Sequence, residues 1–375
     1  MRELTVFGRL LLGNALVPGS ITIVGDRITD VRRGGDTDKI ADLAADIVAP
    51  GLIDLQVNGG FGVEVGADPS SILTLAQRLP EAGVTAFLPT LITSPAAFYP
   101  QVFEAVRAAG IPDGAEPLGL HLEGPFLSPR RAGAHRLDLI EAADDALFNS
   151  LHEASSVRLV TLAPERPGAA ERIRRLRERR IAVSLGHTDA TYEQFVQGVD
   201  QGAMMATHLY NAMSPFGHRA PGVIGAALVD DRVTVGLIAD GVHSHPASVR
   251  LAVRAKGADR IALVSDIMPA AGMPPGVYTL GGQQVTVDKT TAKLADGTLA
   301  GSIATLDQAV RNIVRWTDAT PADALRMASE VPARTLGLSD RGRIVPGAIA
   351  DLALLDDDLT VQATIARGRV VYQRP

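Results

Sequence analysis

Cysteine is absent from the 375 residues of this sequence. Its absence excludes disulfide bonds, thiolate catalysis and every metal site that depends on cysteine ligands. A metal ion in this protein must therefore be held by histidine, aspartate, glutamate or another oxygen donor. Histidine is scarce too, since the chain has only eight. They are His121, His135, His152, His187, His208, His218, His243 and His245.

An excess of positive charge is also lacking. Lysine and arginine total 36 against 42 aspartates and glutamates, which gives a net charge of −6. We therefore expect no nucleic-acid partner. The first apolar stretch is interrupted by Gly13, Asn14 and Pro18, so we predict neither a signal peptide nor a membrane span. We expect a cytoplasmic protein without a membrane partner.

The composition, 46% apolar and 21% charged residues, is typical of a compact protein. Both ends of the chain show the short alternating patterns of β-strands, for example at residues 20–31 and 350–372. Neither end is long enough to bury a good core alone. We therefore predict one small β-sandwich, formed by residues 1–48 together with residues 344–375.

Between the two ends, apolar strand-like segments alternate with helical patterns. The eight segments are 51–57, 84–91, 118–122, 157–162, 181–185, 203–207, 233–239 and 261–265. Eight strands that alternate with helices predict a (β/α)₈ barrel over residues 49–343, and a doubly wound open sheet is the alternative. A β-rich insertion is predicted at residues 269–301, before two final helices.

Residues that carry chemistry stand at the ends of several predicted strands. His121 and Glu123 end the third strand, His187 follows the fifth, His208 the sixth and Asp266 the eighth. In a (β/α)₈ barrel the active site lies where the strands end, at the carboxyl face. We therefore expect these side chains to gather at one rim of the barrel.

Glu123, His187 and His208 form a set of three ligands. Catalytic zinc commonly takes three protein ligands and leaves a position for water, whose pKa it lowers. Asp266 would accept the proton of that water and return it to a leaving amine. A single histidine of this kind is more often a structural imidazole, but the shared position at strand ends favours a metal site.

Seven motifs occur in a diagnostic order. They are PGLIDLQVNG at 50–59, HLEGPF at 121–126, GAH at 133–135, GHT at 186–188, THLYNAM at 207–213, DGVH at 240–243 and SD at 265–266. With these motifs the chain resembles the amidohydrolase superfamily and, within it, the N-acetylglucosamine-6-phosphate deacetylase family. The resemblance covers nearly the whole chain. It implies a (β/α)₈ barrel with a terminal β-sandwich, and the removal of acetate from N-acetyl-D-glucosamine 6-phosphate.

The resemblance also assigns roles to individual residues. It implies that Glu123, His187 and His208 are the metal ligands, and that Asp266 is the general base and acid. It implies further that His135 polarises the amide carbonyl alongside the metal.

The substrate contacts, those to the phosphate included, are implied to be Asn211, the backbone around Ala212, and His243. Arg219 resembles an arginine that such enzymes lend to the phosphate site of a neighbouring subunit, which implies a homodimer. A guanidinium group suits a phosphate dianion. A solvated loop arginine is the alternative for Arg219.

The first strand departs from the superfamily pattern. Many amidohydrolases carry His-x-His there to hold a second metal, whereas this chain has Gln56 and Asn58. Neutral amides are poor zinc ligands. We therefore predict one divalent metal ion per subunit, with zinc expected and with iron, cobalt and manganese as alternatives. A weak second ion supported by Gln56 is the alternative for the number of ions.

Two other functions stay open at this point. A related amidohydrolase could act on a cyclic amide or on a different N-acyl amino sugar. A non-catalytic scaffold with a decayed barrel site is the alternative from another class, and the three retained ligands with Asp266 count against it.

Overall fold

Eight parallel strands form the central barrel of the computed structural model, which describes residues 3–34, 41–68, 70–152 and 154–375. In sheet order, which is also chain order, they are β5 (Leu52–Val57), β8 (Val84–Ile92), β10 (Leu120–Glu123), β11 (Val157–Leu162), β12 (Ala182–Leu185), β13 (Met205–Ala206), β14 (Thr234–Leu237) and β15 (Ile261–Leu263). The short β9 (Glu116–Pro117) pairs with β8. A parallel bridge between Val57 and Ile267 brings the last strand beside the first. All eight predicted strands are confirmed, and the open sheet is excluded.

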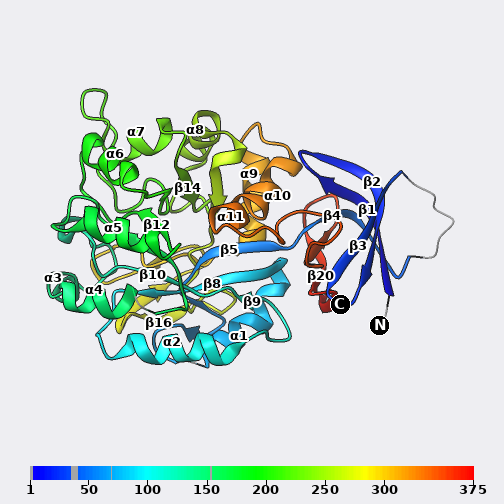
Figure 1. The fold of residues 1–375 in the computed structure, drawn as a ribbon, viewed down its shortest axis with the longest axis horizontal. Coiled ribbons are helices and arrows are strands. Elements are labelled where there is room, and N and C mark those ends of the chain that lie inside the picture. The colour runs from blue at the N-terminus through cyan, green and yellow to red at the C-terminus, as the bar shows by residue number, and fades with distance from the viewer. Residues whose placement is uncertain (1–2, 35–40, 69, 153) are drawn as a thin grey trace.

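Helices cover the outside of the barrel (Figure 1). They are α1 (Ser71–Arg78), α2 (Phe98–Ala109), α3 (Leu137–Glu141), α4 (Asp145–His152), α5 (Ala169–Glu178), α6 (Tyr192–Asp200), α7 (Gly222–Val229), α8 (Pro246–Lys256), α9 (Leu306–Trp316), α10 (Pro321–Met327) and α11 (Glu330–Thr335). The sequence patterns did not predict α7, because its eight residues are glycine or apolar and show no polar face. Among the described residues, no helix combines the length and apolarity that a membrane crossing requires.

The two ends of the chain build one further sheet beside the barrel (Figure 1). Its seven strands, in sheet order, are β21 (Arg369–Gln373), β20 (Val361–Ala366), β19 (Leu352–Leu355), β4 (Leu43–Pro50), β1 (Glu3–Leu12), β2 (Ala15–Val24) and β3 (Arg27–Arg33). The two ends are joined where β4 pairs with β1 on one side and with β19 on the other. A separate β-rich unit from both termini is thereby confirmed, whereas the boundaries after residues 48 and 343 stay a prediction.

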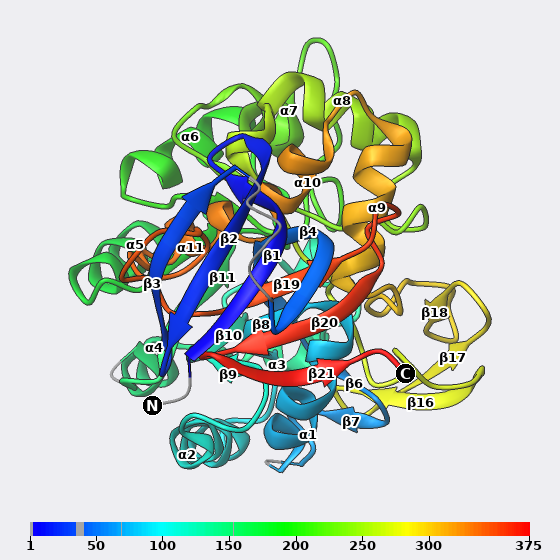
Figure 2. The same cartoon turned by 90° about the vertical axis from the view of Figure 1, so that its right-hand side faces the viewer.

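The predicted insertion forms a small antiparallel sheet at the side of the barrel (Figure 2). Its strands are β16 (Gly276–Leu280), β17 (Gln283–Val287) and β18 (Ala292–Lys293). Leu280 and Val285 pack in one apolar cluster with Ile92, the last residue of β8. The Gln283 side chain donates a hydrogen bond to the Ala134 carbonyl at 2.6 Å. These contacts hold the insertion against the carboxyl end of the barrel, where it forms one wall of a pocket.

Candidate active site

A pocket of about 360 Å³ opens at the carboxyl ends of the barrel strands. Most of the sequence-predicted site residues line it: Glu123, His135, His187, His208, Asn211, Ala212, His243 and Asp266. Glu123 is the last residue of β10, while the other polar residues follow β12, β13, β14 and β15 or lie in loops. The structure thus brings together residues that lie up to 143 positions apart, from Glu123 to Asp266.

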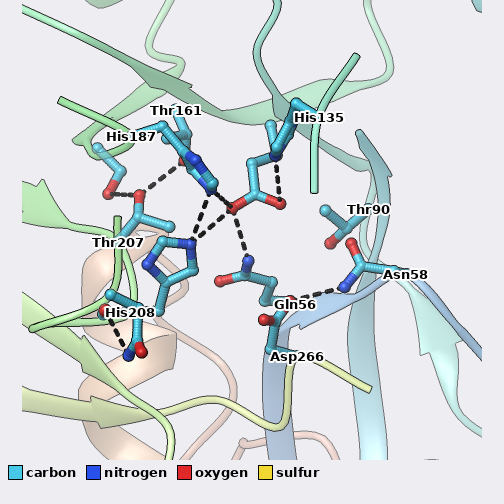
Figure 3. A network of polar contacts seen from close by, with 12 residues as sticks. Gln56, Asn58, Thr90, His135, Thr161, His187, Thr207, His208 and Asp266 are labelled. Carbon is cyan, nitrogen blue, oxygen red and sulfur yellow. Dashed lines mark hydrogen bonds and ion pairs between the residues drawn. The ribbon is translucent and has the colours of Figure 1, made fainter. Parts of the chain in front are cut away.

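Three ligand atoms form a compact triangle in this pocket. His208 Nε2 lies 3.0 Å from Glu123 Oε1 and 3.1 Å from His187 Nε2, and His187 Nε2 lies 3.3 Å from the same oxygen (Figure 3). Two ligands that bind one tetrahedral zinc ion at about 2.0–2.1 Å are about 3.3 Å apart. The three atoms therefore have the spacing that a single metal ion requires.

The ring of His187 is held by a hydrogen bond on the side away from the triangle. Its Nδ1–H donates to the Arg131 carbonyl at 2.9 Å, so the Nε2 lone pair faces the other two ligands. His208 Nδ1 is buried and has no hydrogen-bond partner among the described residues. A glutamate with two neutral imidazoles is a donor set that fits zinc and other divalent transition metals.

Glu123 brings negative charge to the triangle. Burial raises the pKa of this carboxyl, but hydrogen bonds and charge interactions with His187 and His208 outweigh it and hold the pKa well below its usual value. The Gln56 amide donates to Glu123 Oε1 at 2.9 Å. Gln56 therefore stands beside the Glu123 carboxylate as a hydrogen-bond donor.

Asp266 lines the same pocket, and its Oδ1 accepts a 2.6 Å hydrogen bond from Asn58 Nδ2 (Figure 3). Burial, followed by the nearby charge of Glu123, raises the pKa of Asp266 to about 6. A carboxyl group with a raised pKa can both accept and return a proton near neutral pH. The geometry and the electrostatics of Asp266 therefore suit acid–base chemistry.

The backbone is strained at four of the pocket-lining positions. His187, His208, Ala212 and Asp266 have φ values of 46°, 27°, 47° and 52°, in the left-handed region that non-glycine residues rarely adopt. Such strain persists only where the surrounding structure enforces it, and it is concentrated at functional sites.

His135 approaches the triangle from the loop after β10. It is 7% exposed, its Nε2 lies 3.7 Å from Glu123 Oε2, and burial is the main reason that its pKa falls to about 3. One side-chain N or O atom each of Glu123, His135 and His187 also lies within a common 4.8 Å, so these three residues form a second group that could hold a metal ion. His121, by contrast, lies deeper in the barrel, where its Nε2 contacts Thr161 Oγ1 at 2.8 Å.

Of the predicted substrate contacts, His243 and Asn211 line the pocket, whereas Arg219 does not. His243 lines the pocket, and its Nδ1–H is held by Asp240 Oδ2 at 2.7 Å. Asn211 also lines the pocket, while its amide nitrogen donates to the carbonyls of His208 and Leu209. Arg219 is exposed on the loop before α7 and is not among the described residues that line this pocket.

Sequence reasoning missed three residues of the site. Thr93, directly after β8, contacts His135 Nδ1 through both its amide and its hydroxyl. Asn58 and Gln56 were noted only as substitutions for metal ligands, whereas the structure shows them as donors to Asp266 and Glu123. For Thr93, the only available signal was its place at the end of the second strand.

Comparison with known proteins shows what the chain is similar to. The amidohydrolase family model matches residues 47–371. The N-acetylglucosamine-6-phosphate deacetylase of Bacillus subtilis is 42% identical over 339 residues, which cover 88% of this chain and 85% of that protein. The N-acetylgalactosamine-6-phosphate deacetylase of Escherichia coli O157:H7 is 40% identical over 334 residues, which cover 87% and 88%.

A solved structure is similar over the full length of both chains. It is an aspartate-to-alanine variant of N-acetyl-D-glucosamine-6-phosphate deacetylase from Mycobacterium smegmatis in complex with N-acetyl-D-glucosamine-6-phosphate. The sequence identity is 34%, the TM-score is 0.91, and the alignment covers 100% of each chain.

Proposed function

Because this chain belongs to the amidohydrolase family, we propose that it hydrolyses the acetamide of N-acetyl-D-glucosamine 6-phosphate to D-glucosamine 6-phosphate and acetate. The observation that carries this proposal is the triangle of Glu123, His187 and His208 with Asp266 in the same pocket. Three side-chain atoms at 3.0–3.3 Å with a buried carboxyl group in the same pocket count against a non-catalytic scaffold.

Glu123, His187 and His208 would hold one divalent metal ion, and we expect zinc. When bound, such an ion lowers the pKa of a water molecule and polarises a carbonyl group. The amides of Gln56 and Asn58 occupy the places of a possible second ligand pair and are already used as donors to the two carboxylates. This arrangement supports one ion per subunit.

Asp266 moves the protons of the reaction. Asn58 engages Oδ1, so Oδ2 is left to take a proton from the attacking water. Asp266 then gives that proton to the sugar nitrogen as the C–N bond breaks, and acetate leaves. His135 donates a hydrogen bond to the acetamide oxygen and stabilises the negative charge that develops there.

Recognition of the sugar phosphate uses the outer part of the pocket. His243 is oriented by its hydrogen bond to Asp240, and Ala212 lines the same pocket. Both amide hydrogens of Asn211 are used within its own turn, so its side chain offers the pocket an oxygen, which suits a sugar hydroxyl.

Arg219 completes the phosphate site of a second subunit in this proposal, which makes the protein a homodimer. Its exposure on a loop away from its own pocket supports a role in the neighbouring site. Because a phosphate dianion cannot cross a bilayer unaided, the substrate class is consistent with a cytoplasmic enzyme.

The test is acetate release by protein that has been stripped of metal and reloaded with zinc, iron, cobalt or manganese separately. Three substrates are compared: N-acetylglucosamine 6-phosphate, its galactosamine epimer and unphosphorylated N-acetylglucosamine. The relative from Escherichia coli O157:H7 makes the epimer the second candidate substrate. Preference for the unphosphorylated sugar, or activity on neither phosphate, would contradict the proposal.

A further inference from the structure

One nitrogen of His135 is contacted twice by the same residue. Thr93 directs its backbone N–H to His135 Nδ1 at 3.2 Å, and its Oγ1 lies 2.8 Å from the same nitrogen. Thr93 is 2% exposed and directly follows β8, so the contact is buried and lies next to the end of a barrel strand. The two contacts determine where the proton of the imidazole lies.

A backbone N–H can only donate, so Nδ1 of His135 must accept and cannot carry a proton. The proton of the neutral ring is therefore on Nε2. The Thr93 hydroxyl has the same acceptor within reach and adds a second donor to it. His135 Nε2–H then faces the pocket, 3.7 Å from Glu123 Oε2.

We propose that Thr93 is a positioning residue, which holds His135 in the Nε2–H tautomer and makes it a hydrogen-bond donor to the substrate carbonyl. The same assignment removes His135 from the metal ligands, because an Nε2 that carries a proton has no lone pair to offer. Two overlapping groups could hold the metal, since Glu123 and His187 can be joined either by His135 or by His208. The tautomer favours the group with His208. The carbonyl role rests on the proposed deacetylase function.

The arrangement has a clear catalytic use. A donor fixed before the reaction does not have to reorganise when the oxyanion forms, and removal of such a donor typically costs about 100- to 1,000-fold in kcat. Thr93 contacts the His135 ring rather than the substrate, so its loss should have a smaller effect than loss of the donor itself.

The experiment compares Thr93→Val with Thr93→Ser. Valine keeps the shape and the backbone N–H but lacks the hydroxyl, so kcat should fall about 10-fold while KM stays within about 2-fold. Serine restores the hydroxyl and should return kcat to within about 3-fold of the wild type. Metal content should be equal in all three proteins. Thr93→Ala provides a second deletion of the hydroxyl if the valine variant does not fold.

A matched control lies on β8, the strand that Thr93 directly follows. Thr85, in β8, is 1% exposed, and its hydroxyl has no hydrogen-bond partner among the described residues. Thr85→Val should therefore leave kcat unchanged. Full kcat in Thr93→Val, or a serine variant as slow as the valine variant, would overturn the positioning role of the Thr93 hydroxyl, because the valine variant keeps the backbone N–H and loses only the hydroxyl.

A second measurement does not depend on turnover. In zinc-loaded protein labelled with ¹⁵N-histidine, and with His135 assigned by its loss in His135→Gln, Nδ1 should resonate as an unprotonated nitrogen and Nε2 as a protonated one. Protonated Nδ1 in the wild type would disprove the tautomer assignment. Failure of the wild type to release acetate would instead disprove the proposed function and leave this result standing on its own.

Discussion

Asn58 Nδ2 donates a 2.6 Å hydrogen bond to Oδ1 of Asp266, and both side chains are buried in the floor of the pocket. In the proposed mechanism, the second oxygen of Asp266 is the one that exchanges a proton with water, because this bond engages the first. Asn58 thus gives Asp266 a defined orientation, although the two residues are 208 positions apart in the chain.

The first prediction concerns the proton carrier. Asp266→Asn removes the acid–base group but keeps a similar shape, so kcat should fall by about 100- to 10,000-fold. Metal content should stay equal to that of the wild type, because the three ligands are untouched. Near-normal turnover by this variant, with metal analysis alongside, would refute the proton-transfer scheme.

The second prediction concerns the residue that orients this carrier. Asn58→Ala removes the donor to Asp266 and should lower kcat about 10- to 100-fold with a smaller change in KM. The control is Asn14→Ala, which changes an exposed asparagine in the turn between β1 and β2. Equal kinetics of the two variants would mean that the 2.6 Å bond has no part in turnover.

The third prediction concerns metal content. Glu123→Gln and His187→Ala should each lose the metal, since a three-ligand site loses most of its affinity with one ligand. His135→Ala should keep the metal and lose turnover. His218→Ala, at an exposed position, should keep both. The measurement is the metal content of each variant by elemental analysis after dialysis against a weak chelator. Loss of metal from His135→Ala would assign that histidine to the ligand set.

The fourth prediction concerns pH and stability. Burial is the main reason that the pKa of Asp54 rises from 3.8 to about 7, and its Oδ2 has no hydrogen-bond partner among the described residues. The folded state therefore holds a proton that the unfolded state has lost. The stability from this proton is complete below about pH 4 and is lost as the pH rises through about 7.

The measurement is urea unfolding of metal-free protein from pH 5 to pH 8. The free energy of unfolding should decline with pH in the wild type, and the decline should be shallower in Asp54→Asn, whose amide does not titrate. Asp351 contributes a decline of the same sign in both proteins, since burial raises its pKa to about 6. Identical slopes would show that Asp54 does not hold the proton.

The fifth prediction concerns Arg219. A hydrogen bond to a charged group is worth about 1.5–3 kcal/mol, so Arg219→Ala should raise KM for the phosphorylated substrate by about 10- to 100-fold. Arg33→Ala, an exposed arginine at the end of β3, is the control. Co-expression of Arg219→Ala with Asp266→Asn should restore activity, because each mixed dimer would contain one complete site. Without such restoration, Arg219 does not serve a neighbouring subunit.

Local patterns in the sequence were sufficient for the architecture. Eight apolar segments separated by helical patterns predicted the strands of the barrel, because burial on both faces leaves a continuous apolar signal. Helix α7 was not predicted, because a segment of only glycine and apolar residues shows no helical periodicity of polar and apolar positions. The terminal strands could be paired in advance only because neither end could bury a core alone.

The site was accessible to sequence reasoning only in part. Glu123, His187, His208 and Asp266 could be placed at one rim, because parallel strands of a barrel end on the same face. The chemistry of each residue type then indicated a metal and a base. What each ring nitrogen or carboxylate oxygen contacts does not follow from strand order.

Residue type and order along the chain therefore determined the barrel, the terminal sheet and the short set of residues able to hold a metal without cysteine. Only the tertiary structure decided the pairing of Thr93 with His135, 42 positions apart, and of Asn58 with Asp266. The physical reason is that a hydrogen bond forms only when donor and acceptor, here on distant segments, are placed about 3 Å apart to within a few tenths of an ångström. Local propensity does not specify such distances, whereas the packing of the closed barrel does.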